Sequence, residues 1–156
     1  SIGGAVAGLI TGFPVGLGDP AFDKLDALLA HAILSIQTTK GIEFGAGFDV
    51  VGMKGSENND EFESDGQNVS LKTNYSGGIQ AGISNGEDIY LRVAIKPPSS
   101  ISKEQETVSK HLENKSIQVH GRHDPCICPR VVPVIESMMA ITVLDCLLVN
   151  QSLNFK

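Results

Sequence analysis

The sequence predicts an α+β domain in which antiparallel strands pack on buried helices, and three observations favour this class. Apolar residues recur at helical spacing from Phe22 to Ile33 and again after Pro133. Between these segments, apolar and polar residues alternate from Ile89 to Ile95, which is typical of a half-buried strand. Asn85–Gly86 just before that strand is a hairpin signal, so neighbouring strands are expected to run antiparallel.

Length, charge and cysteine usage limit the classes of protein. A chain of 156 residues holds one domain with one core, and a net charge of −6 disfavours nonspecific binding to nucleic acid or to an anionic membrane. Three cysteines without a CxxC pair favour a reducing compartment, and we expect the cytoplasm, with a plastid as the open alternative. The opening Ser1–Gly4 resembles neither an initiator methionine nor a targeting segment, so we expect the interior of a longer protein.

The first elements are expected to be a glycine-rich strand over residues 1–11 and a helix. Asp19 has the character of a helix N-cap and Pro20 that of the first helical residue. A strand is then predicted from Ser35 to Phe44, broken at Gly41. The acidic residues 55–70 are predicted to be a solvated loop.

The second half is expected to be richer in strands. The Asn85–Gly86 turn is predicted to join residues 73–83 to the strand at 89–95 as a hairpin. Residues 106–109 and 116–120 are predicted to form another, with a short helix over 104–112 as the alternative. A helix from Pro133 to about Val149 is apolar nearly all round. We expect it to be covered on more than one side and to be a buried helix rather than a membrane span, because Glu136 and Asp145 interrupt its apolar run.

The segment from Gly121 to Arg130 holds the densest group of reactive side chains. Two guanidinium groups, an imidazole, a carboxylate and two thiols lie within it, directly before an apolar helix. Such groups are costly to bury unless they face a ligand or one another, so we predict a cleft wall here. Asp124 is either a proton acceptor in that cleft or an ion-paired structural residue, and Lys96 with Ser99 and Ser100 is either an anion contact or a solvated turn.

A metal site is a weak alternative for the same segment. His120, His123, Cys126 and Cys128 are ligand types that zinc prefers, but Cys-x-Cys is too tight for the usual chelating pair and a second half-site is missing. We therefore expect no metal. The sequence also contains no GxGxxG, P-loop or GxSxG pattern.

Several multi-residue motifs, in order and over nearly the whole chain, resemble the carboxyl-terminal half of chorismate synthase. They are Ser1–Gly4, Gly16–Ala27, Lys40–Phe48, Thr73–Asn74 with Gly77–Ile79, Gly82–Gly86, Lys96–Ile101 and Gly121–Cys126. The resemblance implies half of a β-α-β sandwich, in which residues 1–156 form a single domain and helices lie between two antiparallel sheets. It also implies a homotetramer.

The activity that this resemblance implies is a lyase reaction of the shikimate pathway, in aromatic amino acid biosynthesis. Phosphate and a ring hydrogen leave 5-enolpyruvylshikimate 3-phosphate by anti-1,4-elimination to give chorismate, with reduced FMN required. Family flavin contacts would fall on Gln37, Thr38, Ala81, Lys96, Pro97, Pro98, Ser99, Ser100 and Arg122. Arg122 and Asp124 would border the substrate, and we hypothesise that Asp124 is a base for the proton on flavin N5.

This sequence departs from the family pattern at Gln37–Thr38, at Tyr75–Ser76 and at Ala81, where a glycine is usual. The amino-terminal half that carries the family's catalytic histidines is missing, and no histidine of this chain matches those positions. We therefore expect the 156 residues alone to be inactive. The alternative function is a noncatalytic fragment, a flavin-binding or subunit-interface module.

Overall fold

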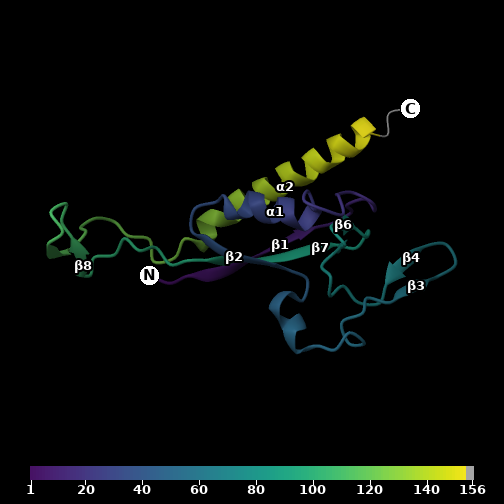
Figure 1. Ribbon diagram of the computed structural model, residues 1–156, viewed down its shortest axis with the longest axis horizontal. Helices are drawn as coiled ribbons and strands as arrows, with labels where there is room; N and C mark the ends of the chain where they lie inside the picture. The colour runs from purple at the N-terminus through teal and green to yellow at the C-terminus, as the bar shows by residue number, and fades with distance from the viewer. Residues whose placement is uncertain (154–156) are drawn as a thin grey trace.

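A three-stranded antiparallel sheet with two helices over one face forms the centre of the computed structural model, which describes residues 1–153 (Figure 1). The strands are β1 (Gly4–Ile10), β7 (Ile89–Ile95) and β2 (Thr39–Phe44), in the order β1-β7-β2. The helices are α1 (Leu25–Leu34) and α2 (Cys128–Leu153). This architecture confirms the predicted α+β class and its antiparallel strands.

The core lies between the sheet and the two helices. Residues Ile89, Leu91, Val93 and Ile95 of β7 are buried, while Arg92 and Ala94 between them are exposed, as the alternating pattern predicts. The helices close the core with side chains at helical spacing: Leu25, Leu29 and Ile33 from α1, and Val131, Ile135, Met139 and Cys146 from α2. The opposite face of the sheet carries the Arg92–Glu43 ion pair.

Helix α1 begins later than predicted, so the assignment of Asp19 as N-cap and Pro20 as first helical residue is wrong. The residues before Leu25 form turns, and Phe22 has a φ of 58° with its side chain 96% exposed. The N–H of Leu25 donates to the carbonyl of Gly82 at 2.9 Å. A backbone partner from a distant loop therefore fixes where this helix starts, in place of a side-chain cap.

Strand β2 is shorter than the predicted Ser35–Phe44, because the chain turns after α1 and pairs with β7 only from Thr39. The predicted break is present as a register shift between Thr39 and Gly41. The 3₁₀-helix η1 (Gly47–Gly52) follows.

The prediction of a solvated loop over residues 55–70 is wrong in part. This region contains the hairpin strand β3 (Phe62–Ser64), which pairs with β4 (Val69–Leu71). Asp60, just before β3, is buried and not solvated. Its carboxylate accepts hydrogen bonds from the Thr73 hydroxyl and from the N–H groups of Tyr75 and Ser76.

The hairpin predicted at Asn85–Gly86 is wrong in position, because the hairpin turn lies earlier in the chain. Strand β5 (Ile79–Gln80) pairs with β6 (Ile83–Ser84), and the two-residue turn between them is Ala81–Gly82. Both turn residues have positive φ, 51° and 84°, which is the geometry that favours a two-residue hairpin. Gly86 also turns the chain, with a φ of 96°, but β6 and the following β7 are not paired.

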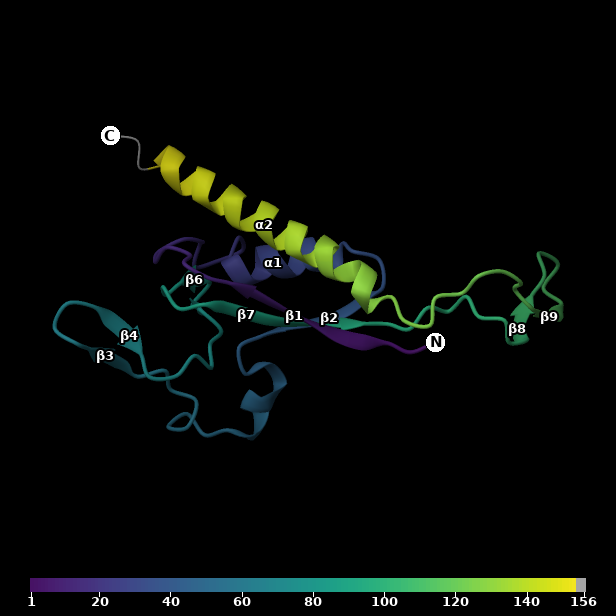
Figure 2. The same cartoon turned by 180° about the vertical axis from the view of Figure 1, so that it is seen from behind.

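The predicted hairpin in residues 101–120 is confirmed, although both strands lie earlier than the predicted 106–109 and 116–120, and the alternative helix over 104–112 is not formed. Strand β8 (Gln105–Val108) pairs with β9 (Asn114–Ile117), and every residue of both strands is exposed. Figure 2 shows that this hairpin extends beyond the end of the central sheet, away from the helices.

Helix α2 starts at Cys128, so Pro133 lies inside it and does not open it. The expectation that this helix is covered on more than one side is wrong for the described chain. One stripe packs on the sheet and α1, while Ile141, Leu144 and Leu148 are more than half exposed. Residues 128–153 are long and apolar enough to cross a membrane by length and composition, although their buried stripe is part of this core.

Candidate functional site

The predicted site residues gather mainly at one end of the sheet, where β7 ends and α2 begins. The N–H of Lys96 donates to the carbonyl of Thr38 at 2.9 Å, which places the segment after α1 beside the segment after β7. Ser1 Oγ donates to the Pro98 carbonyl, and the N–H of Ile2 donates to the Pro125 carbonyl. We call this region the site end, defined by residues 37–38, 96–100 and 121–125.

Asp124 is held by two arginines. Arg122 Nη1 lies 3.1 Å from Asp124 Oδ1, and Arg130 Nη1 lies 3.0 Å from Oδ2. The charged groups of this segment therefore face one another, and the ion pairing that the sequence left open for Asp124 is present. Both guanidinium groups are more than half exposed, so a ligand can reach the pair from solvent.

Arg130, in the first turn of α2, is the partner that sequence reasoning missed. Its signal was present, because it lies inside the same reactive segment as Asp124. Since each carboxylate oxygen has two lone pairs, Asp124 keeps acceptor capacity beyond the two ion pairs.

His123 joins the two chain segments of the site end. Its Nδ1 lies 3.2 Å from Ser100 Oγ, and its Nε2 lies 3.0 Å from the carbonyl oxygen of Val119. The structure thus places Ser100 next to the turn that carries Arg122 and Asp124. No sequence pattern assigned a role to His123 beyond the metal alternative.

Thr38 has two features that fit a ligand contact. Its φ is 78°, unusual for a β-branched residue, and its hydroxyl is buried without a hydrogen-bond partner. The neighbouring Thr39 hydroxyl is also buried without a partner. Unpaired buried hydroxyls beside the strand end are the kind of group that a polar ligand would satisfy.

Ala81 does not join the other predicted contacts in this single chain. It lies in the β5–β6 turn, near the start of α1, and Figure 1 shows β6 at the end of the sheet opposite to β8. Lys96 follows the opposite end of β7. This strand is seven residues long, at a rise of roughly 3.3 Å per residue. A flavin contact by Ala81 remains a prediction.

Two of the three cysteines, Cys128 and Cys146, pack against the core. Burial raises the pKa of Cys128, with a further contribution from its neighbour Cys126, and burial likewise raises the pKa of Cys146. All three cysteines are free. Within residues 1–153, no group of three or more His, Cys, Asp or Glu side chains is arranged to hold a metal ion.

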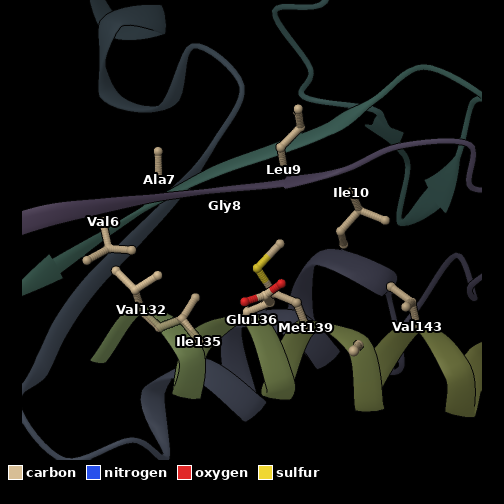
Figure 3. Close-up of a pocket in the computed structure, with 11 residues that line it drawn as sticks. Val6, Ala7, Gly8, Leu9, Ile10, Val132, Ile135, Glu136, Met139 and Val143 are labelled. Atoms are coloured by element: carbon tan, nitrogen blue, oxygen red, sulfur yellow. The ribbon is translucent and has the colours of Figure 1, made fainter. Parts of the chain in front are cut away.

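A hollow of about 410 Å³ lies away from the site end, between β1 and α2 (Figure 3). Val6 and Ile10 point from β1 toward the helix, whereas Ala7 and Leu9 point to the other side. Apolar side chains of α2, among them Met139, form the facing wall. Its lining is nearly devoid of charge, so it is poorly suited to a phosphorylated ligand.

Comparison with known proteins identifies the family. The sequence profile described as chorismate synthase matches residues 1–148. Chorismate synthase of Parabacteroides distasonis is 51% identical over 97% of this chain, and that of Archaeoglobus fulgidus is 52% identical over 96%. A solved structure titled "Crystal Structure of Chorismate Synthase" superposes with a TM-score of 0.75 at 30% identity, covering 95% of this chain.

These matches cover only part of each relative. The chain spans 42% of both curated relatives and 38% of the solved chain. The residues matched by the family profile, 1–148, include the site end. The chain belongs to the chorismate synthase family.

Proposed function

We propose that this chain is the carboxyl-terminal part of a chorismate synthase. The reaction would be the anti-1,4-elimination of phosphate from 5-enolpyruvylshikimate 3-phosphate to give chorismate. The observation that carries the proposal is the convergence of Lys96–Ser100 with the Arg122–Asp124 turn at one end of the sheet, in a chain of this family. Cations beside hydroxyls suit an anionic substrate and stabilise a departing phosphate.

Reduced FMN is the cofactor that the family implies, and the donor set of the site end fits it. Lys96 and Arg122 supply positive charge, Ser99 and Ser100 supply exposed hydroxyls, and the Thr38 hydroxyl is buried without a partner. Together with Gln37, Pro97 and Pro98 these residues would hold the flavin. When bound, reduced FMN supplies electron density to the elimination without net oxidation of the substrate.

Asp124 is the proposed proton acceptor. The two ion pairs orient its carboxylate, and its remaining lone pairs can take the proton from flavin N5. Arg122 lies beside it and would contact the substrate as well as the flavin. Ala81 lies at the other end of the sheet, and a flavin contact by this residue stays a prediction.

The rest of the protein is proposed to cover the exposed face of α2. Ile141, Leu144 and Leu148 form an apolar stripe opposite the buried one, and the family sandwich has helices between two sheets. An amino-terminal part, the larger share of the relatives' length, would supply that second sheet and the remaining charge partners of the substrate. We expect the complete protein to be a homotetramer. We expect it in the cytoplasm, with a plastid as the alternative.

The test is chorismate formation under anaerobic conditions with reduced FMN and 5-enolpyruvylshikimate 3-phosphate. The full-length protein is expected to release chorismate and phosphate in equal amounts, whereas residues 1–156 alone should show no measurable turnover. A folded full-length protein that releases neither product would refute the proposed reaction. Turnover by the isolated 156 residues would refute the need for the amino-terminal part.

A further inference from the structure

We propose that His123 is a positioning residue that makes Ser100 a hydrogen-bond acceptor for the flavin. The Ser100 oxygen would then meet a donor group, a ring N–H or a ribityl hydroxyl, and not the phosphate. This inference rests on the proposed function, since it assigns a direction to one of the hydrogen bonds of the same site.

The direction follows from the two contacts of the imidazole. Val119 contributes a carbonyl oxygen, 3.0 Å from His123 Nε2, and a carbonyl oxygen can only accept. Nε2 therefore carries a hydrogen. In the neutral ring Nδ1 then holds a lone pair, so Ser100 Oγ, at 3.2 Å, donates to it.

This donation uses the one hydrogen of the Ser100 hydroxyl. The oxygen keeps two lone pairs, and the residue is exposed, so it presents an acceptor to whatever binds there. Phosphate oxygens are acceptors and cannot satisfy it, whereas N3–H of the flavin ring and the ribityl hydroxyls are donors. Ser99 is exposed, so its hydroxyl can donate to phosphate.

The same imidazole also fixes the separation of the two segments. Ser100 lies before the β8–β9 hairpin and Val119 lies after it, so His123 ties both segments to the turn that carries Arg122 and Asp124. A second link, from Gln118 Nε2 to the Ser102 carbonyl at 2.7 Å, lies further out along the hairpin. Because this second link remains without the imidazole, loss of the imidazole should change the hydrogen bonding of Ser100 while the two segments stay together.

The experiment is a fluorescence titration of the full-length protein with oxidised FMN and, separately, with riboflavin, which lacks the phosphate. The variants are His123→Phe, Ser100→Ala and the double variant, with His111→Phe at the hairpin tip as control. His123→Phe is expected to raise the Kd for FMN about three- to tenfold, the range expected for one lost hydrogen bond. The factor should be the same for riboflavin, and the double variant should bind no more weakly than Ser100→Ala.

Three results would overturn the inference. The first is an unchanged Kd for FMN in His123→Phe. The second is a loss of affinity on His123→Phe that is equally large in the wild type and in Ser100→Ala, and the third is a loss seen with FMN but not with riboflavin. His123→Asn, which can still accept from Ser100, should recover part of the affinity, and thermal unfolding checks that each variant is folded. A wild-type protein that does not bind FMN would refute the proposed cofactor together with this inference. Normal wild-type binding with unaffected variants refutes the inference alone.

Discussion

Asp60 and Asp124 each hold a loop in place, but they use different kinds of partner. Asp60 is 6% exposed as a whole residue. Its carboxylate accepts hydrogen bonds from one hydroxyl and two backbone N–H groups at 2.7–2.9 Å. The Asp124 carboxylate is paired with two guanidinium groups at 3.0 and 3.1 Å, both largely exposed.

The difference is between a buried carboxylate held mainly by backbone groups and a partly exposed one held by exposed side chains. Backbone N–H groups are fixed by the fold and leave Asp60 no freedom, so its loop is stable and unreactive. Exposed arginine side chains can turn toward an incoming anion while still near Asp124. The donors around a carboxylate therefore decide whether a ligand can reach it.

The largest expected effect is on turnover at Asp124. In the full-length protein, Asp124→Asn should reduce chorismate formation by about 10²- to 10⁴-fold, because a positioned proton acceptor contributes that much. The FMN affinity and the thermal midpoint should change little. Full turnover with normal FMN binding would show that Asp124 is as structural as Asp60.

The next effect is on stability at Asp60. Asp60→Ala should reduce the free energy of unfolding by about 1–3 kcal/mol, because it leaves the partly buried N–H groups of Tyr75 and Ser76 without their acceptor. Urea denaturation measures this change, with Asp65→Ala in the exposed β3–β4 turn as a matched control. Equal losses in the two variants would mean that burial adds nothing at Asp60.

A smaller effect is expected at Arg130, which should alter chemistry more than stability. Arg130→Met leaves Asp124 one partner, and kcat should fall about tenfold while the free energy of unfolding changes by less than about 1 kcal/mol, because exposed ion pairs contribute little. Arg130→Lys should recover part of kcat. A large stability loss without a kinetic effect would place Asp124 in the structural class.

The smallest effect is the pH dependence of stability. Burial raises the pKa of Asp60, but hydrogen bonds from Ser76, Thr73 and the backbone outweigh it and lower the pKa below the ordinary 3.8. A lowered folded-state pKa means that the stabilisation is complete above the unfolded value, near 4, and is lost as the pH falls through the folded value. The stability difference between the wild type and Asp60→Asn should therefore shrink steadily below about pH 4, and a pH-independent difference would contradict this assignment.

Periodic segments were predictable from the sequence because local pattern and burial agree there. The alternation from Ile89 to Ile95 and the apolar stripe of α2 gave the right elements. The starts of helices and the positions of turns were not predictable, because backbone groups far away in the sequence determine them. The Gly82 carbonyl fixes the start of α1 at Leu25, and no signal near Asp19 reveals it.

The sequence could name the residues that gather at the site end but not the contacts between them, and their role toward a ligand stays a prediction. The density of charge between Gly121 and Arg130 predicted a cleft wall and left ion pairing of Asp124 as an alternative, and that pairing is present. The link from His123 to Ser100 depends on two segments that only the folded sheet brings together. Asp60 was hidden in an acidic, polar stretch, where composition alone indicates solvent.

The β8–β9 hairpin separates the two halves of the site in the sequence while both halves stay anchored in one core. Strand β7 lies before its tip and α2 lies after it, and both contribute buried side chains to the same cluster. Leu112 at the tip is 88% exposed. A protease that cuts at Lys110 should therefore yield two fragments that remain associated, so peptide continuity at this point is dispensable for holding the site together.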